Sequence, residues 1–144
     1  MDFRITRLKT VAQCEAFAKN AAERGARDLA DQARVTGVQI RAEAHGATSE
    51  VELECLRAIY ASEEVLSAGK GRRTRATRTW QMIERRGLIP AVERVVTRRQ
   101  VSAGFTALAD MGLKAYAFEA VILRHPESFS SEAVEISRTR LESH

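Results

Sequence analysis

The sequence has few cysteines, prolines, glycines and aromatic residues, and each shortage excludes a class of protein. Its only cysteines, Cys14 and Cys55, do not form the closely spaced framework of a small disulfide-rich secreted domain. We therefore expect both thiols to be reduced and buried, in a cytoplasmic protein. Two prolines and eight glycines in 144 residues argue against a disordered chain. Because aromatic residues are few, aliphatic side chains must form most of the core.

Long apolar runs are absent as well. No stretch approaches the ~20 apolar residues that a transmembrane helix needs. Charged residues, among them Arg4, Arg7 and Lys9, interrupt the start of the chain, where a secretion signal would be apolar. We expect neither a membrane segment nor a secretion signal.

Motifs for catalysis and for cofactor binding are also missing. The histidines His45, His125 and His144 show no ligand spacing with each other or with the cysteines, such as CxxC or HxxxH. The Gly-Lys-Ser/Thr of nucleotide-hydrolysing phosphate loops does not occur. The neighbouring acids Glu63 and Glu64 lie about 100° apart on a helix, so we expect two separate solvated charges. The sequence predicts no metal, no cofactor and no catalytic residue.

Helical periodicity is present almost throughout the chain. Apolar residues recur every three or four positions, and two candidate capping boxes, Thr10 with Gln13 and Ser49 with Glu52, mark helix starts. The expected helices cover about 10–25, 27–45, 49–67, 74–86, 90–99, 103–110, 114–124 and 131–141.

This pattern predicts an all-α fold, a compact bundle of about seven to eight helices in a single domain over residues 1–144. The two glycines within residues 68–71 predict a mobile, hinge-like break there, which is also a candidate boundary between sub-units.

The C-terminal part of the chain has a short glycine turn between apolar helices. Leu108 precedes the loop 111–113, apolar residues follow over 117–121, and a further helix starts at about 131. In these features residues 103–142 resemble the three-helix ubiquitin-associated domain. The resemblance implies a three-helix C-terminal unit with this packing, and not ubiquitin binding.

Positive charge is concentrated between residues 70 and 99. This segment has ten basic residues against two acids, Glu84 and Glu93, so it carries +8 in a chain whose net charge is +4. The basic residues are Lys70, Arg72, Arg73, Arg75, Arg78, Arg85, Arg86, Arg94, Arg98 and Arg99. All but one are arginine, whose planar guanidinium matches phosphate oxygens and stacks on bases. The segment therefore predicts a non-enzymatic protein that binds nucleic acid, DNA or RNA, mainly through phosphates.

Smaller features of the basic segment leave alternatives open. Trp80 is placed either to stack on a base or to pack in the core. Residues 77–99 resemble a helix-turn-helix with a lengthened turn of five residues. Residues 106–124 have the better helix-turn-helix spacing but no arginines on the second helix, which indicates ordinary core packing.

Two other functions compete with nucleic-acid binding. The arginine face could dock on an acidic protein partner, as in an adaptor or inhibitor, or pair with the chain's own glutamates. A third hypothesis is a small all-α ribonuclease, because Arg138 and His144 have the separation found in the HEPN-type enzymes.

Overall fold

The computed structural model describes residues 3–98 and 103–142, and every regular element within them is helical, which confirms the predicted all-α fold. The elements are α1 (Phe3–Thr6), α2 (Val11–Glu23), α3 (Arg27–His45), α4 (Glu50–Lys70), α5 (Thr77–Arg86), α6 (Leu88–Arg98), α7 (Ala103–Asp110), the 3₁₀ turn η1 (Lys114–Tyr116), α8 (Phe118–Arg124), the 3₁₀ turn η2 (Pro126–Ser128) and α9 (Ser131–Glu142). Among the described helices, none is both long and apolar enough to cross a bilayer.

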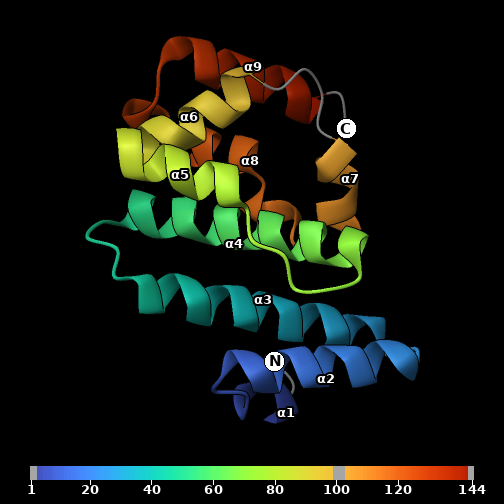
Figure 1. Cartoon of the computed structure of the whole chain (residues 1–144). Coiled ribbons are helices and arrows are strands. Elements are labelled where there is room, and N and C mark those ends of the chain that lie inside the picture. Colours follow the sequence, from blue (N-terminus) through green and yellow to red (C-terminus); the bar gives the residue numbers. More distant parts are fainter. Residues whose placement is uncertain (1–2, 99–102, 143–144) are drawn as a thin grey trace.

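The helices form layers on either side of α4, the longest of them (Figure 1). On one side α4 contacts α3, which in turn contacts α1 and α2. On the other side α4 contacts α6, α7 and α8, and α9 packs on α6 and α8. The amino-terminal helices and the carboxy-terminal helices therefore meet mainly through α4.

Three groups of buried apolar side chains hold these layers together. The largest lies between α4, α6, α8 and α9 and includes Ile59, Val92 and Val121. A second lies between α3, α4 and η1 and includes Val38 and Leu113, and a smaller third joins α1, α2 and α3. Both cysteines are buried and unpaired, as expected.

The helix starts follow the predicted caps in part. Thr10 Oγ1 accepts from the Gln13 N–H at 3.1 Å and Gln13 Oε1 accepts from the Thr10 N–H at 3.2 Å, which confirms the first capping box. Ser49 also caps α4, because its hydroxyl accepts from the Glu52 N–H at 3.2 Å. The Glu52 carboxylate, however, accepts from Thr48.

Three expected boundaries are wrong. Gly69 lies inside α4, which continues to Lys70 and ends at Gly71, whose φ of +71° suits glycine alone. The link between α5 and α6 is the single residue Gly87, because α6 already starts at Leu88. Pro90 lies in the first turn of α6, where backbone N–H groups have no helical partners, so the missing N–H of proline costs nothing.

The third wrong boundary concerns the helix expected over 114–124. It is divided into η1 and α8 by Ala117, whose backbone is extended. Leu113 belongs to the second apolar group and Phe118 to the first, so the break lets the chain pass from one group to the other.

Candidate nucleic-acid interface

The basic segment follows one side of α4. After Lys70 the loop 71–76 turns back along α4, and α5 then runs beside α4 in the opposite direction (Figure 1). The basic residues of the segment are therefore distributed from the carboxy-terminal end of α4 to the carboxy-terminal end of α5. The basic residues of α6 lie on the next helix of the chain.

A buried carboxylate of α4 fixes the start of α5. Glu63 is only 3% exposed, and its Oε2 accepts from the backbone N–H of Ala76 at 2.9 Å and from Trp80 Nε1 at 2.7 Å. Ala76 is the N-cap of α5 and offers no side-chain cap. The carboxylate thus supplies from a neighbouring helix the negative group that a helix N-terminus favours. The expectation of a solvated Glu63 is wrong.

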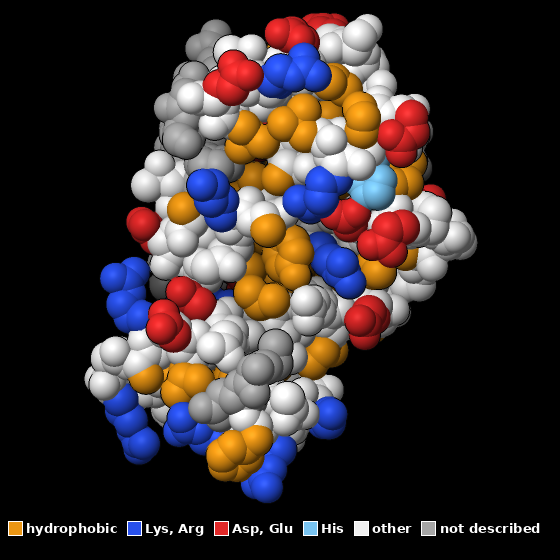
Figure 2. All heavy atoms as spheres, turned by 180° about the vertical axis from the view of Figure 1, so that it is seen from behind, with side chains coloured by type: hydrophobic (Ala, Val, Ile, Leu, Met, Phe, Trp, Pro, Cys, Tyr) orange, Lys and Arg blue, Asp and Glu red, His pale blue; other side chains and the backbone are white. Residues whose placement is uncertain are grey.

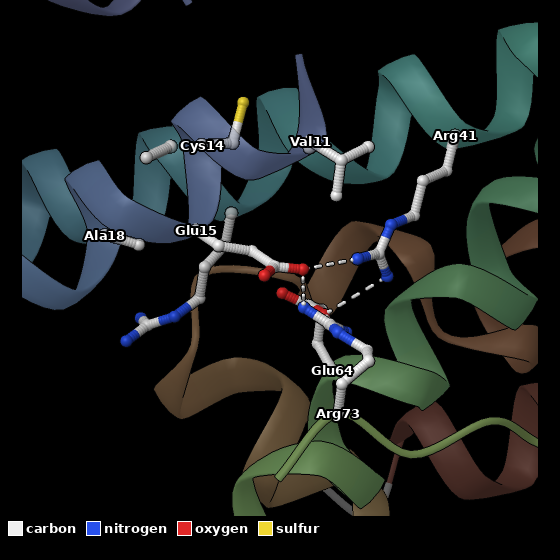
Figure 3. Close-up of a pocket in the computed structure, with 10 residues that line it drawn as sticks. Val11, Cys14, Glu15, Ala18, Arg41, Glu64 and Arg73 are labelled. Carbon is white, nitrogen blue, oxygen red and sulfur yellow. Dashed lines mark hydrogen bonds and ion pairs between the residues drawn. The ribbon is translucent and has the colours of Figure 1, made fainter.

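Arg73 points inward to carboxylates of two helices (Figure 3). Its Nη2 lies 2.6 Å from Glu15 of α2, and its Nη1 donates to Glu64 of α4; Arg41 pairs with the same two acids at 2.7 and 3.7 Å. Partial burial lowers the pKa of Arg73, but the hydrogen bonds and charges of the two glutamates outweigh it and raise the pKa overall. The network binds the loop to α2, and Glu64 is not the solvated charge expected.

A cavity of about 20 Å³ lies beside this network, which is room for roughly one water molecule. Cys14 lines it (Figure 3), and burial raises the pKa of this thiol. The cavity is too small for an organic ligand.

Most of the other predicted residues reach solvent. In the described part of the chain, six of them are exposed and lie in no ion pair: Lys70, Arg72, Arg78, Arg85, Arg86 and Arg98. Arg94 is half-buried, Arg75 is 70% exposed with its Nε 4.0 Å from Glu63 Oε2, and Arg99 lies outside the described residues. The structure therefore leaves much of the charge of this segment uncompensated.

The helical positions arrange these side chains in two pairs. Arg78 and Arg85 are seven residues apart and lie on one face of α5, whereas Arg94 and Arg98 are four apart on α6. On the face of the molecule opposite α5, Lys and Arg side chains are interspersed with Asp and Glu (Figure 2).

Trp80 lies among aromatic neighbours next to this surface. Its half-buried ring stacks on His45, with centroids 5.4 Å apart and an interplanar angle of 17°, and a tilted contact at 5.3 Å joins it to Tyr60. Ring atoms of Trp80 also pack against the largest apolar group. Trp80 therefore packs against the core, which is one of the two placements that its sequence position left open.

Of the candidate ribonuclease pair, only Arg138 lies within the described residues. Arg138 pairs with Glu135 at 2.6 Å, and His144 lies outside the described residues. Burial raises the pKa of Cys55 to about 12, so the reactive thiolate is not formed near neutral pH. Within residues 3–98 and 103–142, no three acidic, histidine or cysteine side chains gather as a metal site would require.

His125 and Arg124 both bond to Glu54, which joins α8 to α4. Burial raises the pKa of Glu54, but the hydrogen bonds from His125 and Arg124 outweigh it and hold the pKa below its ordinary value. The sequence alone could not predict this contact, because the partners are some 70 residues apart.

Comparison with known proteins assigns no family to the chain. It matches no family model, and neither the curated proteins nor the solved structures contain a significant match. Its function must therefore be argued from the residues themselves.

Proposed function

We propose that this protein binds nucleic acid without catalysis, through a basic strip made of Lys70, Arg72, Arg78, Arg85 and Arg86. The observation that carries the proposal is their lack of acidic partners: each is exposed and lies in no ion pair with a described residue. A chain with 19 acidic residues has ample means to neutralise such side chains. Exposed cations without acidic partners attract a polyanion.

The contacts that hold α5 and the loop 71–76 in place favour the same function. The bonds of Glu63 hold the start of α5, and the bonds of Arg73 hold the loop, so the strip is fixed before any ligand arrives. A pre-ordered surface loses less conformational entropy on binding. In this arrangement Arg73 is a support for the strip, and its neighbours Arg72 and Arg75 face solvent.

The strength of binding should depend steeply on salt. Neutralising about five phosphates gives a slope of log affinity against log salt of about −4.5 on duplex DNA and about −3.5 on a single strand. Titration of labelled DNA and RNA at several salt concentrations measures the slope. A flat dependence, or no binding at ~50 mM salt, would contradict the proposal.

A matched pair of charge-reversal variants separates the strip from overall charge. Arg78→Glu with Arg85→Glu changes the strip, and Lys19→Glu with Arg24→Glu makes the same charge change on exposed residues of α2 and its C-cap, outside the strip. We expect the first variant to lose at least about tenfold in affinity and the second less than about threefold. Equal losses would mean that net charge alone drives binding.

A further inference from the structure

A stack of flat side chains borders the basic strip. The Trp80 ring lies at 17° to the ring of His45, the last residue of α3, and the guanidinium carbon of Arg75 lies 5.4 Å from the Trp80 ring centroid. His45 and Arg75 are both exposed, so groups at the edge of this stack are in contact with solvent. Arg75 belongs to the basic segment, so the stack joins that segment at the start of α5, whereas Arg78 lies on another face of the helix.

The stack is held in place from within. Trp80 Nε1 donates to the buried Glu63 carboxylate, and Tyr60 contacts the ring at a tilt of 53°. The hydrogen bond already satisfies the indole N–H of Trp80. The position of the Trp80 ring therefore does not depend on the contact with His45. An exposed imidazole parallel to a fixed indole is a flat platform that a further ring can extend.

We propose that His45, Trp80 and Arg75 form a stacking site for an unpaired base, and that the ligand of the basic strip is single-stranded nucleic acid. This inference rests on the proposed function and specifies its ligand. Proteins that bind single strands combine a basic track for the backbone with aromatic or arginine side chains on which bases stack. In a duplex the bases are stacked on each other, so their faces are not available to this platform.

The size of the effect follows from the energetics of stacking. One base on an aromatic side chain contributes about 1–3 kcal/mol, which is a factor of about 5 to 150 in affinity. Stacking needs a base but no 2′-hydroxyl, so DNA and RNA strands should bind similarly at this site.

The test compares three single-stranded probes of similar charge and one duplex. A thymidine oligonucleotide of about ten residues, the corresponding uridine RNA, an abasic deoxyribose-phosphate oligomer of that length and a duplex are titrated against the protein. Because Trp80 is the only tryptophan, its fluorescence reports on the platform. We expect both base-containing single strands to quench it and to bind at least about fivefold more tightly than the abasic oligomer. The duplex should leave the fluorescence unchanged.

Variants of His45 test the platform without disturbing the core, because the residue is exposed at a helix end. His45→Ala should bring the affinity for the thymidine strand down toward that for the abasic oligomer, and His45→Tyr, which keeps a ring, should preserve the difference. Arg78→Ala serves as the control, since loss of a phosphate contact should weaken both probes equally.

The outcomes distinguish the two proposals. If the thymidine strand and the abasic oligomer bind equally and the fluorescence is unchanged, the stacking site is refuted and phosphate binding stands. If no probe binds at ~50 mM salt, both proposals fall.

Discussion

Glu63 is the residue on which the geometry of the candidate site depends most. It is almost fully buried, it has no close ion pair, and its Oε2 accepts from the Ala76 N–H and from Trp80 Nε1. A buried carboxylate persists only where such bonds replace its hydration. The same oxygen therefore fixes both the start of α5 and the orientation of the indole.

Replacing Glu63 should destabilise the protein strongly. In Glu63→Ala two donors lose their acceptor, so the free energy of unfolding should fall by about 2–5 kcal/mol. Glu63→Gln keeps one carbonyl oxygen in place and should cost less than about 2 kcal/mol. Chemical denaturation followed by Trp80 fluorescence measures both. Equal, small losses in the two variants would contradict the role assigned to this carboxylate.

The sequence predicted the directions of the two acidic side chains beneath the candidate site, but not their partners. Spacing on a helix showed that Glu63 and Glu64 point in different directions, and this is correct. It could not show that each direction meets another element, because Ala76 and Arg73 reach these acids only after the loop 71–76 turns back. For the same reason the sequence could not distinguish Arg72 from Arg73. In the structure Arg73 pairs with two glutamates and Arg72 is exposed.

At the scale of elements, the loop 71–76 has two kinds of arginine. Arg73 bridges α2 and α4 through Glu15 and Glu64, whereas Arg72 is exposed without an ion pair in the described residues. One side chain therefore anchors the loop, and the other extends from it. Two alanine variants at adjacent positions can separate these roles.

Arg73→Ala should lower the free energy of unfolding by about 1–2 kcal/mol, a modest value because the guanidinium is partly exposed. Its affinity for nucleic acid should fall only because the loop is less ordered, so the salt slope should stay unchanged. Arg72→Ala should leave stability within about 0.5 kcal/mol of the original and make the salt slope shallower by about one. Denaturation curves and salt titrations of both variants check this, and identical behaviour would refute the distinction.

The positions of the longer helices were predictable, because each buries one face and the apolar spacing records it. The interruption at Ala117 was not, since both η1 and α8 contain the apolar residues that a continuous helix would need. Which apolar group each residue joins depends on α3, α4 and α6, and local periodicity carries no information on these distant neighbours.

At the scale of the whole molecule, the contact of Glu54 with Arg124 and His125 joins the central helix α4 to the carboxy-terminal layer. The pKa of the Glu54 carboxyl is lowered in the folded state from its ordinary value of 4.5. A carboxyl whose pKa is lowered by folding stabilises the protein above the unfolded pKa, and this contribution is lost as the pH falls through the folded value.

The variant Glu54→Gln should therefore be less stable than the original by about 1–3 kcal/mol at pH 6 to 7. The difference should shrink below about pH 4.5, where the original carboxyl also becomes neutral. Unfolding curves of both proteins between pH 3 and pH 7 measure this. A difference independent of pH would show that the charge of Glu54 has no part in the contact.

The dependence of α5 on a cap from another helix limits how the protein can be dissected. A synthetic peptide covering residues 70–99 would keep every positive charge of the segment, but neither Glu63 nor His45 would be present to position Trp80. Short isolated helices are marginal in water, so such a peptide should attract polyanions as a flexible polycation, without a preference for exposed bases. The folded domain would then bind exposed bases selectively, whereas the fragment would bind any polyanion through its charge.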